Sequence, residues 1–407
     1  MMLKAWLQTA ARQPLAGFLA LFLAASFFIP SQPAWALLFY VVGLPLTIWR
    51  LIKGADINWR SPQIVLVGLM IGFSALSMAW GWRESPSATR SFGQLLSAAC
   101  TAAFFLGLLA SLKDNRDLAR TLGWIFIIGG AINVLIGFAL NFAAYRTDFD
   151  RFDGWAITKH QILGSMVLGQ CYLFALDRCL REPRWRIAAA VSAVLCLAFI
   201  IMTGSRGPLV AAIIASPLLL IGLSKRSGLV LLLAPILCAV VAAGLFCFKP
   251  HLFQLMIDEL WGRGDSYRPR IWSFALQRVA EHPWFGHGPA AELAMPRIRP
   301  GLEIYNHPHN FYLAALFYGG VTGLVLLLAV VGYTSVKLIR PTVRSGSPIV
   351  LAMWVSALIG GLTDMAQVTD GPVHIWLIFW VPLIMASRMI LDDEDGHLPA
   401  EAAGGAR

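Results

Sequence analysis

The chain has 407 residues, of which 58% are hydrophobic and 13% charged, and a formal net charge of +10 at pH 7. A soluble protein usually carries about a quarter charged residues. The composition therefore excludes an ordinary soluble domain and predicts an all-α polytopic membrane protein. Much of the positive charge lies in the loops that we assign to the cytoplasmic side, as is usual for membrane proteins. We therefore expect no nucleic-acid partner.

Apolar stretches of membrane-spanning length recur along the whole chain. About 20 apolar residues are needed to cross the hydrocarbon core, and by this rule we expect about twelve transmembrane helices. They lie near residues 14–30, 34–52, 62–80, 92–111, 122–143, 160–177, 186–203, 207–223, 228–248, 308–335, 348–365 and 373–391. Only Thr203–Gly207 separates the seventh stretch from the eighth, and the glycines and proline around it predict a break in the helix there.

The basic residues predict which side each loop faces. With both termini in the cytoplasm, the inside loops hold most of them, including the cluster Arg178–Arg186, whereas the short outside loops hold few. This asymmetry follows the positive-inside rule. The first stretch resembles a signal peptide, with Ala34-Trp35-Ala36 as a possible cleavage site, but cleavage would leave the next span without a leader. We therefore predict an uncleaved first helix.

The chain divides into four parts by this pattern. We expect helices one to nine in residues 1–248, an outside loop in 249–307, helices ten to twelve in 308–391, and a disordered cytoplasmic tail in 392–407. The six cysteines lie in or beside predicted spans, which gives no sign of a disulfide framework.

The outside loop is long enough to have a function of its own. Residues 250–261 and 270–282 carry apolar side chains at helical spacing, and 282–289 is a cluster of turn residues. Arginines and a lysine recur along the loop, and long loops are exempt from the positive-inside rule. We predict a small, helical, cationic lid on the outer face.

Arg206 is the first candidate for binding an anion. It lies between two apolar runs, where arginine is costly and usually functional, although it could simply snorkel to the interface. Gly204 and Gly207 would leave room for a ligand near the backbone. A helix beginning near Pro208 would direct its positive dipole end to the same place. This combination suits a phosphate group.

Arg268 and Arg270 supply two more guanidinium groups in the lid. Either one could instead be a solvated loop charge, and the sequence leaves open which of the two has a role. The short motif Arg263-Gly264-Asp265 in the same loop is treated as a chance match.

The histidines before the tenth span are the candidate general bases. Pro308 suits the first position of a helix, which would place His309 in the first turn and Asn306 or His307 at the cap. The helix dipole and the nearby arginines both disfavour an imidazolium ion here. A neutral histidine at this place could accept a proton. The assignment between His307 and His309 stays open, because either could merely cap the helix.

The sequence offers two candidate metal sites, each with a competing explanation. His287, His307 and His309 could ligate zinc, yet the last two lack the i, i+4 spacing that presents two ligands on one helix face. The aspartates of the segment 148–153 could hold a divalent cation that bridges phosphates, although a solvated acidic loop explains them as well. The chain contains no phosphate-binding loop for a nucleotide.

Four short motifs occur in an order that resembles the O-antigen ligase and polymerase superfamily of bacterial envelope glycosyltransferases. They are SRG at 205–207, RPRIW at 268–272, HPWFGHG at 282–288 and HN at 309–310, the last followed by a span with Gly319, Gly320 and Gly323. The size of the chain and the lack of a large soluble domain look most like the ligases of this superfamily.

The resemblance implies a GT-C-like fold in the bacterial inner membrane with the active site on the periplasmic face. It implies that a glycan moves from undecaprenyl pyrophosphate to a sugar of lipid A–core during lipopolysaccharide biosynthesis. By this pattern Arg206 and Arg268 bind the pyrophosphate and His309 deprotonates the acceptor hydroxyl. Arg270, His307 and Asn310 are further candidates for substrate binding. The superfamily is regarded as metal-independent, so the resemblance implies neither a metal ion nor another cofactor.

Three other readings remain. An O-antigen polymerase would share these motifs and use a second lipid-linked glycan as acceptor. A transporter of lipid-linked glycans would be expected to show internal repeats and ionisable residues near the middle of the membrane. A non-catalytic membrane scaffold would tolerate loss of His309 and Arg206.

Overall fold

The computed structural model describes residues 13–115, 117–144, 151–223, 267–296 and 305–397. All regular elements in these residues are helical, and none of the described segments forms a strand. The prediction of an all-α protein is therefore confirmed for this part of the chain.

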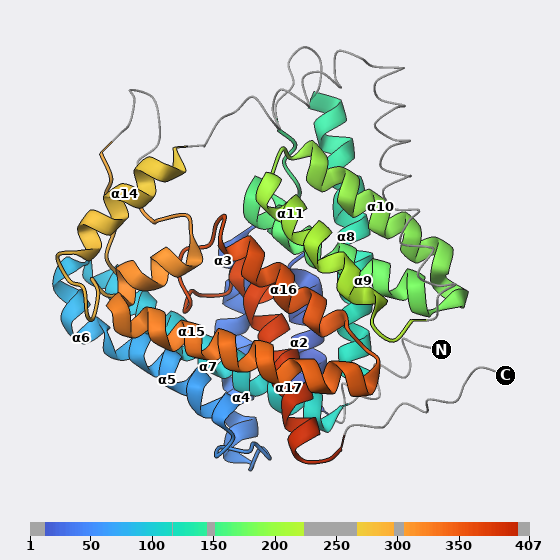
Figure 1. Ribbon diagram of the computed structural model, residues 1–407, viewed down its shortest axis with the longest axis horizontal. Coiled ribbons are helices and arrows are strands. Elements are labelled where there is room, and N and C mark those ends of the chain that lie inside the picture. The colour runs from blue at the N-terminus through green and yellow to red at the C-terminus, as the bar shows by residue number, and fades with distance from the viewer. Residues whose placement is uncertain (1–12, 116, 145–150, 224–266, 297–304, 398–407) are drawn as a thin grey trace.

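Most of the described helices up to residue 220 are joined by short connections, and longer segments separate several of the later ones. In chain order they are α2 (Pro14–Ala25), α3 (Gln32–Leu38), η1 (Phe39–Gly43), α4 (Leu44–Ile52), α5 (Pro62–Leu76), α6 (Met78–Gly81), η2 (Trp82–Glu84), α7 (Ala88–Asp114), α8 (Asp117–Ala144), η3 (Ala156–Thr158), α9 (Gln161–Arg181), η4 (Pro183–Trp185), α10 (Arg186–Met202), α11 (Arg206–Ala215), η5 (Ser216–Leu220), α14 (Arg268–Val279), α15 (Phe311–Ser345), α16 (Ile349–Gly361), η7 (Trp376–Trp380) and α17 (Val381–Glu394). Figure 1 shows α5 and α15 side by side, with α14 above one end of this pair.

Six helical segments within the described residues are long and apolar enough to cross a membrane. They are Gln32–Ile52, Pro62–Glu84, Ala88–Asp114, Asp117–Asn141, Pro183–Met202 and Phe311–Ser345. The predicted count of about twelve spans is therefore not confirmed. The predicted span 228–248 and the predicted lid helix 250–261 lie outside the described residues. The break near Thr203–Gly207 is confirmed, because α10 and α11 are separate helices.

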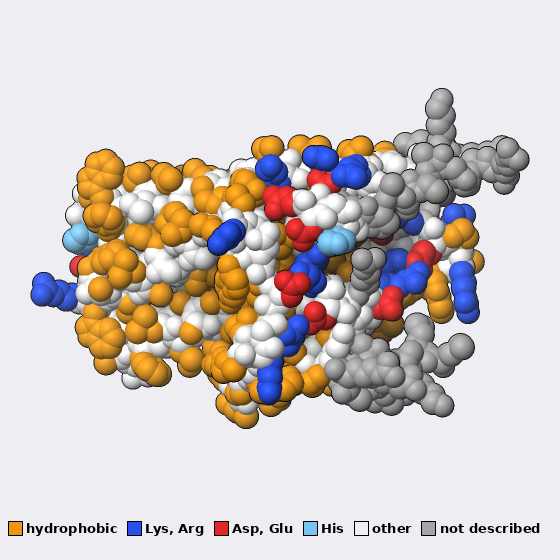
Figure 2. All heavy atoms as spheres, turned by 90° about the horizontal axis from the view of Figure 1, so that it is seen from below, with side chains coloured by type: hydrophobic (Ala, Val, Ile, Leu, Met, Phe, Trp, Pro, Cys, Tyr) orange, Lys and Arg blue, Asp and Glu red, His pale blue; other side chains and the backbone are white. Residues whose placement is uncertain are grey.

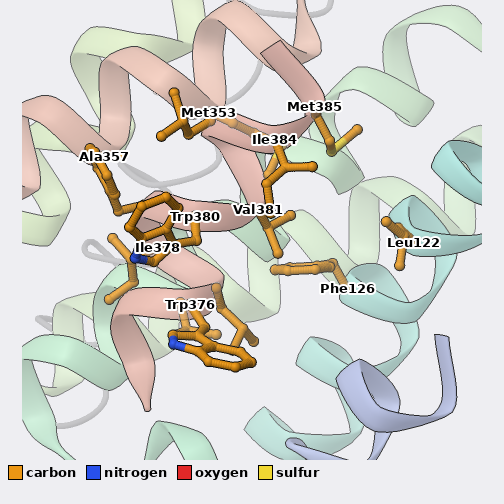
Figure 3. Packing of buried hydrophobic residues seen from close by; sticks show 14 of the residues in the cluster. Leu122, Phe126, Met353, Ala357, Trp376, Ile378, Trp380, Val381, Ile384 and Met385 are labelled. Carbon is orange, nitrogen blue, oxygen red and sulfur yellow. The ribbon is translucent and has the colours of Figure 1, made fainter. Parts of the chain in front are cut away.

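The core is formed by large side chains that several helices bury against one another. Trp376 and Trp380 of η7 and Trp354 of α16 are fully buried, and Phe126 of α8 belongs to the same cluster. Figure 3 shows side chains of α8, α16, η7 and α17 meeting in this cluster. Burial of large aromatic residues from helices far apart in the sequence fixes how these helices cross.

Ion pairs join the loops that were predicted to lie inside. Arg50 pairs with Asp114 at 2.6 Å, and Arg344 pairs with Asp393 at 2.6 Å. Figure 2 shows basic and acidic side chains gathered on the face seen from below, beside surfaces that are largely hydrophobic. The orientation of these loops in the membrane stays a prediction. Helix α17 continues to Glu394, past the predicted start of the tail at residue 392.

Helix α15 is broken at Gly320, which corrects the prediction of one continuous span over 308–335. Gly320 has φ 63° and ψ −164°, so the residues before and after it form two helical pieces. The turn 282–288 fills this break, since the N–H groups of His287 and Gly288 donate to the carbonyls of Phe317 and Tyr318 at 3.0 and 2.8 Å. Figure 1 shows the ribbon of α15 changing direction between the two pieces.

Replacing Gly320 by alanine is expected to prevent normal folding. The backbone conformation of Gly320 is one that only glycine adopts readily, and a Cβ there would overlap the backbone of Trp284 and Phe285. Gly332 in the same helix is the matched control, because a Cβ there would meet nothing within 4 Å. The yield and melting temperature of the detergent-purified variants measure the effect, and equal stability of the two would contradict the account.

Candidate functional site

The segment before α15 and the segment after α16 come together around His309. Asn310 is the N-cap of α15, because its Oδ1 accepts hydrogen bonds from the N–H groups of Tyr312 and Leu313 at 3.1 and 3.0 Å. Its Nδ2 donates to the carbonyl of Leu362 at 3.1 Å, just past the end of α16. The predicted start of this helix at Pro308 is therefore wrong, and His309 lies just before the cap.

His309 and Asp364 form a hydrogen-bonded pair. His309 Nδ1 lies 3.1 Å from Asp364 Oδ1, and the Asp364 side chain is 1% exposed whereas that of His309 is 25% exposed. Two backbone conformations that non-glycine residues rarely adopt occur here, with φ 51° at His309 and φ 98° at Met365. Such strain persists only where the surroundings hold it, and it is frequent at functional sites.

The charge of Asp364 decides the tautomer of His309. Asp364 lies beyond the last residue of α16. Its burial alone would raise its pKa, but the hydrogen bond from His309, the neighbouring imidazoles and the N–H of Met365 outweigh this and lower the pKa below its usual range. An ionised carboxylate only accepts hydrogen bonds, so His309 Nδ1 must carry the proton. In the neutral ring, Nε2 is then free to accept a proton.

His307 supports the same turn. Its Nδ1 accepts a hydrogen bond from the N–H of His309 at 3.2 Å, and the two rings lie 3.8 Å apart between centroids. Burial, followed by the nearby His309, lowers the pKa of His307 to about 4. His307 is therefore neutral near pH 7. Among the described residues, Asp364 is the only carboxylate within hydrogen-bonding reach of either ring, and it pairs with His309.

Arg206 is the first residue of α11, at the positive end of that helix. The next residue, Gly207, packs so closely on Thr363 that a Cβ would overlap the threonine side chain. The space beside Gly207 is therefore occupied by Thr363. This corrects the prediction that Gly207 leaves room there for a ligand. Because Thr363 precedes Asp364, this contact brings the start of α11 next to the His309–Asp364 pair.

Arg268 and Arg270 lie in the first turn of α14, and they differ in how far they are buried. Arg270 is exposed, whereas Arg268 is half-buried. Trp272, one turn after Arg268 on the same face, donates from Nε1 to the carbonyl of Pro308 at 3.1 Å. The face of α14 that carries Arg268 is therefore fastened to the turn that carries His309.

The predicted zinc triad is not brought together. His307, His309 and Asp364 form one cluster whose ligand atoms lie within 4.8 Å of one another, while His287 belongs to another cluster. In the first cluster, both Nδ1 atoms take part in hydrogen bonds, that of His307 with the N–H of His309 and that of His309 with Asp364. Of the predicted aspartates, Asp148 and Asp150 lie outside the described residues, and Asp153 is exposed.

Sequence reasoning missed Asp364 and Arg151. Asp364 is an acidic residue in an otherwise apolar stretch, and such residues usually mark a functional site. Arg151 lies among the acidic residues of segment 148–153, which drew attention to the carboxylates instead. It donates from Nε to the carbonyl of Thr203 at 2.6 Å and from Nη2 to Ser205 Oγ at 2.8 Å. Arg151 therefore supports the turn immediately before Arg206.

Comparisons with known proteins agree with the motifs. Residues 191–328 match a family model described as O-Antigen ligase. The chain is also 25% identical over 378 residues to a protein of Pseudomonas aeruginosa strain PAO1 named O-antigen ligase. The aligned region covers 91% of this chain and 88% of that protein. The resemblance to O-antigen ligases that was inferred from the four motifs is therefore confirmed.

Proposed function

We propose that this chain, which resembles O-antigen ligases, is itself an O-antigen ligase of the bacterial inner membrane. It transfers a glycan from undecaprenyl pyrophosphate to a sugar hydroxyl of lipid A–core in lipopolysaccharide biosynthesis. The reaction takes place on the periplasmic face, both termini lie in the cytoplasm, and membrane lipids surround a GT-C-like arrangement of about twelve helices.

The pairing of His309 with the buried Asp364 carries this proposal. The carboxylate fixes the proton on Nδ1 and directs the basic Nε2 away from Asp364. It also stabilises the imidazolium ion that forms when His309 takes the proton of the acceptor hydroxyl. A base held in one tautomer by a third group is the arrangement that activates a weak oxygen nucleophile.

The arginines stabilise the departing pyrophosphate. As the glycosidic C–O bond to the pyrophosphate breaks, negative charge grows on the leaving oxygen, and Arg206 with the start of α11 stabilises it. Arg268 acts on the same group from α14, and the exposed Arg270 has the smaller role. Attack by the hydroxyl from the face opposite the leaving group inverts the anomeric centre. No step of this proposal needs a metal ion or another cofactor.

A genetic experiment tests the proposal against its alternatives. We expect that deleting the gene in its host leaves lipid A–core without long glycan, while long lipid-linked glycans accumulate. A polymerase would instead leave lipid A–core capped by a single repeating unit, and a transporter would leave the lipid-linked glycan on the cytoplasmic side. Gel separation of lipopolysaccharide and lipid-linked glycan distinguishes these results, and either of the latter two would overturn the proposal.

Asp364 is a positioning residue in this account. Asp364→Asn is expected to slow transfer by up to about 10⁴-fold, because the amide can donate to Nδ1 and hold His309 in the wrong tautomer. The acid limb of the pH–rate profile should also move to lower pH, since the imidazolium ion loses its carboxylate partner. The exposed Asp153→Asn is the control and should leave both unchanged. A slower Asp364→Asn enzyme with an unmoved pH profile would indicate a purely structural role.

A further inference from the structure

A second cluster of ionisable side chains lies where the turn 282–288 meets the end of the α5–α6 segment. Glu84 ends η2, His282 follows α14, and His287 lies within the turn. Their ligand atoms lie within 4.8 Å of one another, and the cluster shares no residue with the His309 site. At the end of the molecule where α6 and α14 lie, Figure 2 shows a histidine beside an acidic side chain.

Close backbone packing holds the two segments together. A Cβ on Gly81 would lie 2.6 Å from the Cα of Gly288, so these glycines allow α6 to touch the turn directly. Trp80 donates from Nε1 to the carbonyl of Phe285 at 3.2 Å. The positions of Glu84 and His287 relative to each other are therefore set by the fold.

His287 is held in one tautomer and leaves one nitrogen without a partner. Its side chain is fully buried, and its ring stacks on Phe317 at 4.8 Å between centroids. Nε2 lies 2.8 Å from the carbonyl of Arg278, to which it must donate, because a carbonyl oxygen only accepts. Nδ1 of the neutral ring is then a hydrogen-bond acceptor, and this buried atom has no hydrogen-bond partner.

The unpartnered nitrogen faces the Glu84 carboxylate, which is also an acceptor. His287 Nδ1 lies 3.5 Å from Glu84 Oε2, and His282 Nε2 lies 3.7 Å from Glu84 Oε1. These distances are too long for good hydrogen bonds. Two ligands that each lie about 2.1 Å from a tetrahedral zinc ion are about 3.4 Å apart. The two imidazoles lie near this spacing from different oxygens of the carboxylate, and one ligand atom of each residue lies within 4.8 Å of the others, so a small shift of the exposed side chains would close the cluster around a small cation.

Arg278 also approaches the carboxylate. Its Nη2 lies 3.6 Å from Glu84 Oε2, while its Nη1 pairs with Glu281 at 2.9 Å. The guanidinium balances part of the acidic charge, but it leaves His287 Nδ1 without a hydrogen bond. The carbonyl of the same residue orients His287, as backbone carbonyls commonly orient the histidine ligands of metals.

We propose that Glu84, His282 and His287 bind a zinc ion, with water as the fourth ligand. Two imidazoles and one carboxylate form a common ligand set for zinc. The ion fastens the turn 282–288, which fills the break in α15, to the end of the α5–α6 segment. The open position with water is typical of catalytic zinc sites, but this cluster shares no residue with the His309 site, so the effect proposed for the ion is to hold the turn in place.

The zinc content of purified protein tests this site directly. The full chain is purified in detergent through a histidine-free tag, incubated with zinc chloride, dialysed and measured by mass spectrometry of the metal. We expect about one zinc ion per chain in the wild type and little in Glu84→Gln or His282→Ala. The control is Glu281→Gln, which removes a neighbouring exposed carboxylate and should retain zinc. Similar zinc content in the wild type and the Glu84→Gln, His282→Ala double variant would overturn the proposal.

The melting temperature gives a second readout. A ligand that binds only the folded chain stabilises it, so EDTA should lower the melting temperature of the wild type and of Glu281→Gln. It should not lower that of Glu84→Gln. If EDTA had the same effect on all three proteins, the stabilising ion would lie elsewhere and the proposal would fail. Neither readout depends on whether the chain transfers glycans.

Discussion

Replacement of His309 by alanine is expected to slow glycan transfer by about 10²- to 10⁴-fold, which is the usual contribution of a general base. The structure gives His309 the one buried carboxylate partner in this turn, Asp364 at 3.1 Å. The loss should appear in kcat, because the proton is taken in the transition state. The rate of transfer onto lipid A–core by purified variants measures the effect.

His307→Asn is the matched control for this prediction. The Asn side chain can keep an acceptor near the position of His307 Nδ1, which receives the N–H of His309 at 3.2 Å. Because the pKa of His307 is about 4, this ring is neutral at the pH of the assay and its loss removes no charge. We expect His307→Asn to keep most of the activity. Full activity of His309→Ala together with an inactive His307→Asn would reverse the two roles.

Arg206→Ala is expected to lower the rate of transfer by about 10²- to 10³-fold. This is the usual effect of removing one group that stabilises negative charge in a transition state. Arg206→Lys should recover little of this, because an ammonium ion cannot make the two parallel contacts of a guanidinium with a phosphate. Full activity of the lysine variant would show that charge alone is sufficient.

The pair Arg268 and Arg270 offers an internal comparison for the same test. Arg268→Ala should lose activity because its face of α14 is fastened to the His309 turn through Trp272. Arg270→Ala should lose less, since Arg270 is exposed. Equal losses in both variants would mean that α14 contributes only a diffuse positive charge.

Much of the helical fold could be predicted because apolar runs and their breaks reflect local chemistry. The separation of α10 from α11 and the amphipathic helix α14 follow from glycine and proline positions and from helical spacing. The break in α15 could not be predicted in this way. It depends on the turn 282–288 inserting at Gly320, which is a contact between segments distant in the sequence.

The candidate site was predicted in its types of residue but not in its contacts. Arg206 begins a helix where nearby glycines and a proline predicted one, whereas α14 begins at Arg268 rather than at residue 270, and His309 lies before its helix rather than in the first turn. The contacts of His309 with Asp364 and of Gly207 with Thr363 join segments that no local pattern connects. A single aspartate in an apolar stretch was the available signal for Asp364.

The most direct test of glycan transfer uses purified protein, a glycan on undecaprenyl pyrophosphate and lipid A–core, with EDTA present and the products separated on a gel. We predict that the glycan appears on lipid A–core, and that His309→Ala protein forms no such product. Glu84→Gln protein is run in parallel to separate a catalytic metal from the proposed structural zinc. A product that EDTA abolishes in both wild type and Glu84→Gln, and that a divalent cation restores, would contradict metal-independent transfer by His309.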